Sequence, residues 1–228
     1  MLSPTRRFLK RFHPEGIPWP ASAVYDAISR TSIFQRQYEV VAKDIVGCRS
    51  EGLVLDIGTG PGHLLLHLLR QAPRLRLTGL DASPAMVAAA RKHVADAELS
   101  GLIDVTEGNA SALPFPDASF DMVVSTGSIH HWKDPAVALN EVYRVLKNGG
   151  DALMYDLVSD TPAAVLAETA REFGRLRVLL FWLHSFEEPF YTREDFEALA
   201  RSTPFHAGRT RFVGLLCCLV LRKDAKCT

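Results

Sequence analysis

The chain has 228 residues, of which 47% are hydrophobic and 23% are charged. This composition is typical of a globular domain with a substantial core, and its net charge of zero argues against a broad nucleic-acid-binding surface. No apolar stretch reaches the roughly 18 residues of a transmembrane helix, and the four cysteines lack zinc-binding spacing, so we expect a cytoplasmic protein.

The first 20 residues form a leader in which basic and apolar side chains interleave between residues 6 and 12. Such a segment can contact anionic lipid or act as a transit peptide. It lacks the apolar region of a secretory signal. A solvated leader ended by its prolines is the simpler interpretation.

Apolar residues from Ser22 to about Val46 recur at intervals of three and four, which predicts helix with a break near Thr31-Ser32. We place residues 1–47 in an N-terminal leader and helical cap, and residues 48–228 in the main domain.

Strands and helices then alternate. The predicted strands cover residues 53–56, 75–80, 103–107, 120–125 and 152–157. The predicted helices cover residues 61–71, with Pro61 at the start, 84–97, capped by Ser83, and 135–146, closed by Asn148-Gly149-Gly150. This alternation predicts an α/β fold with a mostly parallel sheet and helices on both faces.

The pattern changes after residue 158. A helix is predicted from Thr161-Pro162 to about Phe173, followed by an apolar stretch to residue 186. Thr192 and Asp195 have the spacing of a capping box for a helix that ends near Arg201. Residues 205–210 and 213–221 read as two final strands that complete the sheet as an antiparallel hairpin.

A glycine-rich turn follows the first predicted strand, in the segment Val54 to Gly62. Gly58, Gly60 and Gly62 leave the backbone open to a ligand at the start of a helix. Their spacing matches neither the dinucleotide fingerprint nor the P-loop. The acid Asp56 favours a ligand with an ammonium group over a pyrophosphate.

This turn resembles motif I (D-x-G-x-G-x-G) of the class I S-adenosylmethionine (SAM) dependent methyltransferases. Residues 113–121 (LPFPDASFD) and 141–150 (EVYRVLKNGG) resemble further elements of the family, with Asn148 where proline is usual. The resemblance covers about residues 50–157 and is nearest to methyltransferase type 11 and quinone-biosynthesis enzymes. It implies a Rossmann-like, seven-stranded sheet of order 3-2-1-4-5-7-6 with the last strand antiparallel.

The resemblance and the strand ends together predict a SAM site. Asp81 is expected to accept the ribose hydroxyls, Asp56 to hold the turn and the methionine end, and Asn109 to lie at the adenine edge. The predicted cofactor-binding residues are Asp56, Gly58, Thr59, Gly60, Gly62, Asp81, Ala82, Met86, Asn109, Ala110, Ser125 and Thr126.

We predict transfer of a methyl group from SAM to a small molecule, with S-adenosylhomocysteine as product and no metal. A non-catalytic SAM-binding regulatory or assembly module is the alternative. His130 or His131 is a candidate general base, although the His-His-Trp segment can equally be a structural loop. An aminopropyl transferase would need acids for a polyamine after the fourth strand, where residues 128–132 have none.

The acceptor must be chosen outside the SAM-binding core. Tyr25 and Tyr38 are candidates because an N-terminal helix lines the pocket in the family that the chain resembles. The insertion 158–190 contains Trp182 in an apolar stretch, which can pack on the sheet, close over a lipophilic or aromatic substrate as a lid, or form a dimer interface. The chain is therefore expected to be a monomer or a homodimer.

Overall fold

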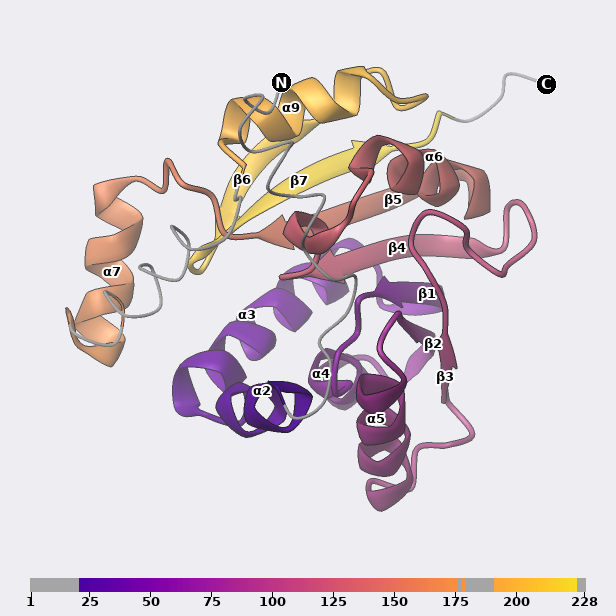
Figure 1. Cartoon of the computed structure of the whole chain (residues 1–228), viewed down its shortest axis with the longest axis horizontal. Coiled ribbons are helices and arrows are strands. Elements are labelled where there is room, and N and C mark those ends of the chain that lie inside the picture. Colours follow the sequence, from indigo (N-terminus) through magenta and orange to yellow (C-terminus); the bar gives the residue numbers. More distant parts are fainter. Residues whose placement is uncertain (1–20, 176–177, 179–190, 225–228) are drawn as a thin grey trace.

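The computed structural model of the protein describes residues 21–175, 178 and 191–224, and its centre is a seven-stranded sheet (Figure 1). The strand order is β3-β2-β1-β4-β5-β7-β6, and β7 runs antiparallel to both of its neighbours. The predicted fold class, strand order and antiparallel strand are confirmed.

The strands are β1 (Glu51–Ile57), β2 (Arg74–Asp81), β3 (Ile103–Glu107), β4 (Phe120–Thr126), β5 (Leu146–Asp156), β6 (Arg209–Val213) and β7 (Leu216–Arg222). The helices are α2 (Ala21–Ser29), α3 (Ser32–Cys48), α4 (His63–Gln71), α5 (Pro84–Asp96), the 3-10 turn η1 (Ile129–His131), α6 (Pro135–Val145), α7 (Ala163–Phe173) and α9 (Arg193–Arg201).

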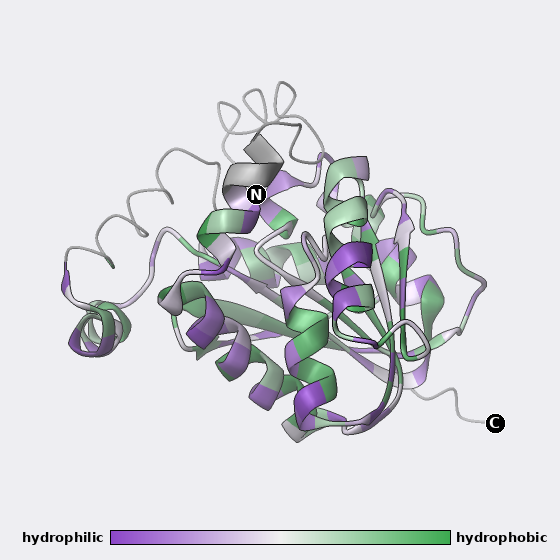
Figure 2. Ribbon diagram, turned by 90° about the horizontal axis from the view of Figure 1, so that it is seen from below, coloured by the Kyte–Doolittle hydropathy of each residue, from purple (hydrophilic) through white to green (hydrophobic). Residues whose placement is uncertain are grey.

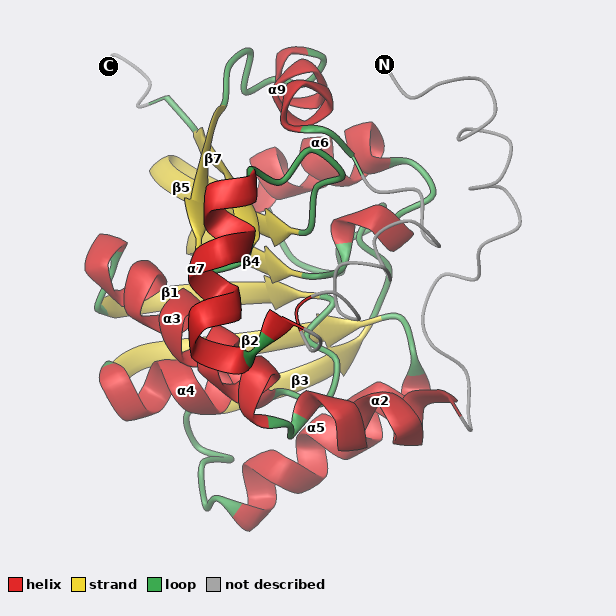
Figure 3. Ribbon diagram, turned by 90° about the vertical axis from the view of Figure 1, so that its left-hand side faces the viewer, coloured by secondary structure: helices red, strands yellow, loops and turns green. Residues whose placement is uncertain are grey.

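The sheet separates two hydrophobic layers, with α6 and α9 on one side and α3 and α4 on the other (Figure 3). The helices carry both hydrophobic and hydrophilic stripes (Figure 2), as amphipathic helices on a sheet do. Along β4, Val123 contributes to the first layer whereas Met122 and Val124 contribute to the second. Burial on both faces explains why the parallel strands are nearly continuous hydrophobic runs.

Local capping signals in the sequence are confirmed. The first helical region breaks at Thr31, which is the N-cap of α3. The Ser83 hydroxyl accepts from the Met86 N–H at the start of α5, and Thr192 and Asp195 form a complete capping box. The Ser83 and Thr192 side chains satisfy N–H groups that the first helical turn leaves without partners, whereas the Thr31 side chain makes no capping hydrogen bond.

Two predicted boundaries are wrong beside glycines. Helix α4 starts after Gly62, whose φ of +79° makes it the N-cap, so Pro61 lies in the turn and not at the helix start. Asn148-Gly149-Gly150 does not follow the helix as a cap but lies within β5, which begins at Leu146. The register between β4 and β5 shifts there, because the pairs Phe120–Leu146 and Met122–Asp151 enclose extra residues.

The first strand of the final hairpin is also shifted, to Arg209–Val213. Phe205 is buried in the α6–α9 layer and precedes the strand. A Cβ on Gly208 would lie 2.7 Å from Leu219 and 2.8 Å from Ala200, so the backbone at this point packs directly between β7 and α9. Packing of this segment as a loop outweighs its strand propensity.

Several predictions concern residues outside the described ranges, namely the leader, Trp182 and most of the apolar stretch 174–186. Among the described residues, no helix is both long and apolar enough to cross a bilayer.

Candidate SAM-binding site

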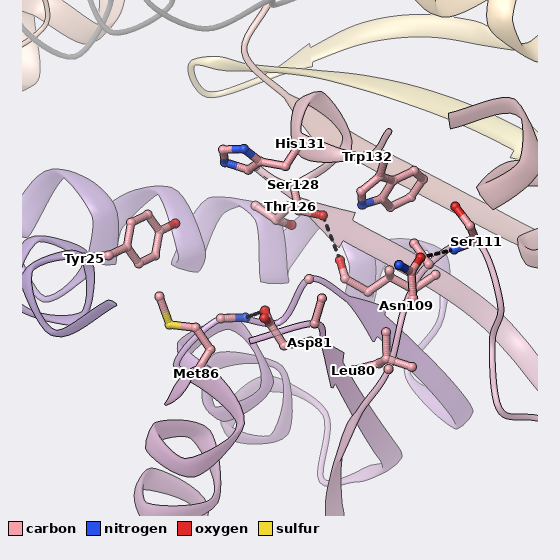
Figure 4. Close-up of a pocket in the computed structure, with 17 residues that line it drawn as sticks. Tyr25, Leu80, Asp81, Met86, Asn109, Ser111, Thr126, Ser128, His131 and Trp132 are labelled. Atoms are coloured by element: carbon pink, nitrogen blue, oxygen red, sulfur yellow. Dashed lines mark hydrogen bonds between the residues drawn. The ribbon is translucent and has the colours of Figure 1, made fainter. Parts of the chain in front are cut away.

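A pocket of about 740 Å³, open to solvent, lies at the carboxyl ends of the central strands (Figure 4). This is the expected edge for a ligand of an open α/β sheet. Its lining residues come from α2, the glycine turn and the segments after β2, β3 and β4: Tyr25, Ile57, Gly58, Gly60, Leu80, Asp81, Ala82, Met86, Gly108, Asn109, Ala110, Ser111, Thr126, Gly127, Ser128, His131 and Trp132.

The glycine turn forms the floor of the pocket. Gly58, Gly60 and Gly62 all have positive φ, which residues with a Cβ rarely adopt. The N–H groups of Gly58 and Thr59 donate to the Leu80 carbonyl at 2.7 and 3.1 Å, which fixes the turn against β2. At Gly60 a Cβ would meet only Tyr25, at 3.8 Å, so the backbone there faces the open pocket.

The Gly58→Ala substitution is expected to destabilise the fold by about 2–3 kcal/mol, through backbone strain and overpacking together. Its Cβ would lie 2.3 Å from the Ser128 Oγ. Gly127→Ala is a matched control, because Gly127 also has positive φ, +64°, but open space around its Cβ position. Urea unfolding should show a free energy of unfolding about 1 kcal/mol lower for the Gly127→Ala control than for the wild type. Equal costs for both variants would contradict the steric argument.

Asp81 holds the turn from the end of β2. Its Oδ2 accepts from the Gly60 N–H at 2.8 Å and its Oδ1 accepts from the Ser83 N–H at 2.9 Å. Burial raises the pKa of Asp81, and these backbone donors oppose that shift. The carboxylate lines the pocket, where its remaining acceptor capacity faces the ligand space.

Asp56 and Thr59 lie beneath the turn and outside the pocket lining. The Thr59 hydroxyl donates to the Asp56 Oδ2 at 2.7 Å, whereas the buried Asp56 Oδ1 has no hydrogen-bond partner. Burial raises the pKa of Asp56 to about 7, with the Thr59 hydrogen bond opposing and Asp81 adding to the shift. Asp56 was expected to hold both the turn and the methionine end of SAM. It contacts the turn through Thr59 but does not line the pocket.

The segment after β3 is ordered by two sets of hydrogen bonds. The Asn109 Oδ1 accepts from the Ser111 N–H at 2.7 Å, which turns the chain at the pocket (Figure 4). Further along, Arg144 donates to the carbonyls of Leu113 and Phe115 at 3.0 and 2.8 Å and pairs with Glu141. The Glu-x-x-Arg element of the sequence therefore anchors the loop that follows the pocket residues.

The far wall of the pocket follows β4. Thr126 lines it with a buried Oγ1 that has no partner. Ser125 is buried behind the wall, where its hydroxyl is 2.8 Å from the Ser128 Oγ. His131 and Trp132 complete this wall from η1 and the residue after it (Figure 4).

Only one of the two adjacent histidines lines the pocket. His130 is 6% exposed, and its Nδ1 lies 2.8 Å from the Asp156 Oδ2. The backbone N–H of His130 donates to the same carboxylate, which ties η1 to the end of β5. His130 is thus placed as a structural residue, and His131 is the histidine with access to a ligand.

Tyr25 lines the pocket, whereas Tyr38 does not. Tyr38 packs near His63 and His67, and its ring centroid lies 6.0 and 6.3 Å from theirs. Burial is the main cause that raises the pKa of Tyr25.

Eight predicted cofactor residues line the pocket: Gly58, Gly60, Asp81, Ala82, Met86, Asn109, Ala110 and Thr126. Four others support it from outside the lining: Asp56, Thr59, Gly62 and Ser125. Lining residues that the sequence prediction missed are Ile57, Leu80, Gly108, Ser111, Gly127, Ser128 and Trp132. Each missed residue lies within a few positions of a predicted one or in the segment after β4, so proximity to a strand end was the available signal.

The residues fit SAM. A carboxylate after β2, an open backbone at Gly60 and an unpaired Thr126 hydroxyl offer partners to a ribose and to a polar amino-acid end. Met86 and Ala110 supply apolar surface for a base. When bound, SAM supplies a methyl group that its sulfonium has already activated.

The comparisons with known proteins bear on the family of the chain. Residues 55–154 match the family model described as a methyltransferase domain. The chain is 33% identical over 196 residues to the ubiquinone/menaquinone biosynthesis C-methyltransferase UbiE of Geobacter sulfurreducens, covering 79% of this chain and 76% of that protein. It is 36% identical to 2-methyl-6-phytyl-1,4-hydroquinone methyltransferase 1 of rice (Oryza sativa subsp. japonica), over 61% of this chain and 42% of the rice protein.

Among solved structures, one from Methanococcus maripaludis that is assigned to the S-adenosyl-L-methionine-dependent methyltransferases superposes with a TM-score of 0.71 at 25% identity. The match covers 90% of this chain and 93% of that one. The chain therefore belongs to the SAM-dependent methyltransferases, and SAM is its cofactor.

Proposed function

We propose that the methyl acceptor is a lipophilic aromatic ring of the quinol type. The observation that carries this proposal is the set of aromatic side chains in the lining. His131 and Trp132 follow Thr126 in the chain, and Tyr25 lies on α2, across the pocket from Trp132 (Figure 4). Flat aromatic side chains favour a flat, apolar ligand through stacked and edge-to-face contacts. The quinone and hydroquinone C-methyltransferases among the relatives support the same class.

The chain contributes mainly by positioning. Methyl transfer requires the acceptor atom about 3–3.5 Å from the methyl carbon and in line with the bond that breaks, and such placement supplies roughly 7–11 kcal/mol of barrier reduction. His131 is the candidate proton acceptor, because an imidazole titrates near neutral pH and this one lines the pocket. A base of this kind adds about 10²–10⁴-fold to the rate.

A panel of acceptors tests the proposal. We expect S-adenosylhomocysteine to form when the protein and SAM are incubated with short-chain hydroquinols, and turnover at least about tenfold slower with aliphatic amines of similar size, which lack the aromatic contacts. Product is measured by mass spectrometry, with His131→Gln as the variant that should lose turnover and keep SAM affinity. Preference for amines would overturn the acceptor class. SAM binding without turnover on any acceptor would instead support the non-catalytic module.

A further inference from the structure

A second cluster of potential ligands lies outside the SAM pocket, where α2 meets α4 and α5. It consists of Asp26, His63 and His93, one residue from each helix. Their ligand atoms all lie within 4.8 Å of one another, and their side chains are only 11–19% exposed. Three partly buried side chains that can bind a metal ion thus meet from separate helices. This distinguishes the cluster from a group of exposed acidic residues.

The distances suit a small transition-metal ion. The His63 Nε2 is 3.2 Å from the Asp26 Oδ1, and the His93 Nε2 is 3.8 Å from the Asp26 Oδ2. Tetrahedral zinc with bonds of 2.0–2.1 Å places its ligand atoms about 3.3 Å apart. The two imidazoles are stacked, with centroids 5.0 Å apart, so both rings border the same space beside Asp26.

Hydrogen bonding orients His93 as a ligand. Its Nδ1 lies 2.8 Å from the Pro61 carbonyl, which can only accept, so Nδ1 carries the proton and donates it. The lone pair of the neutral ring is then on Nε2, the atom that faces Asp26. A backbone carbonyl that fixes the tautomer in this way is the usual outer partner of a metal-binding histidine.

A cationic side chain, the Arg30 guanidinium, already lies beside these ligand atoms. Arg30, the residue that follows α2, lies with its Nη2 2.7 Å from the Asp26 Oδ2 and 2.9 Å from the His93 Nε2. Its side chain is 58% exposed, so it can swing into solvent. The guanidinium donates to the same two atoms that a metal ion would bind.

From this arrangement we propose that Asp26, His63 and His93 bind one divalent transition-metal ion of the zinc or cobalt type, in competition with the Arg30 guanidinium. Two imidazoles and one carboxylate leave the fourth position to water. No local pattern predicts this site, since its ligands are 37 and 30 residues apart and follow no metal-binding motif. Bound metal would tie α2 to the core next to Tyr25, which lines the SAM pocket.

Titration of the untagged protein with Co²⁺ and Zn²⁺ near neutral pH tests this site directly. We expect one ion per chain by calorimetry, and Co²⁺ visible absorption of a four-coordinate nitrogen and oxygen site. Arg30→Ala should tighten binding because the competing cation is gone, whereas His93→Gln and His63→Gln should each weaken it at least about tenfold. His67→Gln is the matched control, because His67 lies one turn after His63 but hydrogen-bonds to Gln35.

Three results would overturn the proposal. The first is the absence of stoichiometric binding in both the wild-type protein and Arg30→Ala. The second is binding that His93→Gln and His63→Gln leave unchanged in variants whose circular dichroism matches the wild type. A thiolate charge-transfer band in the Co²⁺ spectrum would show that the ion binds the exposed Cys48 or another cysteine, which also contradicts the assignment.

Discussion

Replacing Asp81 with alanine is expected to weaken SAM binding by about 10²–10⁴-fold. Hydrogen bonds to a charged group contribute about 1.5–3 kcal/mol each, and we expect the carboxylate to accept both ribose hydroxyls. The variant also removes the acceptor of the Gly60 N–H, which loosens the floor of the pocket. Isothermal titration calorimetry with SAM measures the effect.

Asp104→Ala is the matched control for this experiment. Asp104 is an exposed carboxylate on the neighbouring strand β3 and does not line the pocket. Asp104→Ala changes the net charge by the same amount as Asp81→Ala, so both variants share any long-range electrostatic effect on SAM binding. SAM affinity that is unchanged in both variants would refute the role of Asp81.

Stability should fall as the pH rises through the range in which Asp56 ionises. The folded-state pKa of Asp56, about 7, is above its ordinary value of 3.8. The proton is therefore bound more tightly in the folded state, and the stability that it confers is lost between those two pH values. At 1.36 kcal/mol for each unit of pKa, the wild type should lose about 3 kcal/mol relative to Asp56→Asn between about pH 5 and pH 8.

Urea unfolding of both proteins across this range gives the measurement, and the difference between them cancels other titrating groups. Thr59→Val adds a second check. It removes the hydroxyl that favours the carboxylate form, so the pH at which stability is lost should move upward. Parallel pH profiles for the wild type and Asp56→Asn would show that this carboxyl ionises normally.

The sheet and the part of the pocket that binds SAM, the methyl donor, were predictable from sequence because local signals specify them. Strand ends followed by polar residues placed Asp81 and Asn109, and the family resemblance supplied the strand order. The predicted boundaries of helices and strands were wrong where packing against residues distant in the sequence determines the backbone conformation. Gly208 is in a loop because β7 and α9 approach it closely, and no local pattern records that approach.

The histidines show a second limit of sequence reasoning. His130 and His131 are neighbours with the same chemistry, yet one binds the buried Asp156 and the other lines the pocket. The choice depends on the end of β5, which is 26 residues away. The Asp26–His63–His93 cluster was missed for the same reason, since three helices assemble it only in the folded chain.

The two halves of the pocket belong to different kinds of structure, and this affects how substrate preference can change. The half that binds SAM is formed by turns whose N–H groups donate to the sheet. The Gly58 N–H, for example, donates to the Leu80 carbonyl. In the opposite wall, Tyr25 belongs to α2 and His131 to η1, and both elements lie outside the sheet's ladder of hydrogen bonds. We therefore expect that changes in those two short elements alter the choice of acceptor while SAM binding is retained, and that grafting them onto a relative exchanges substrate preference.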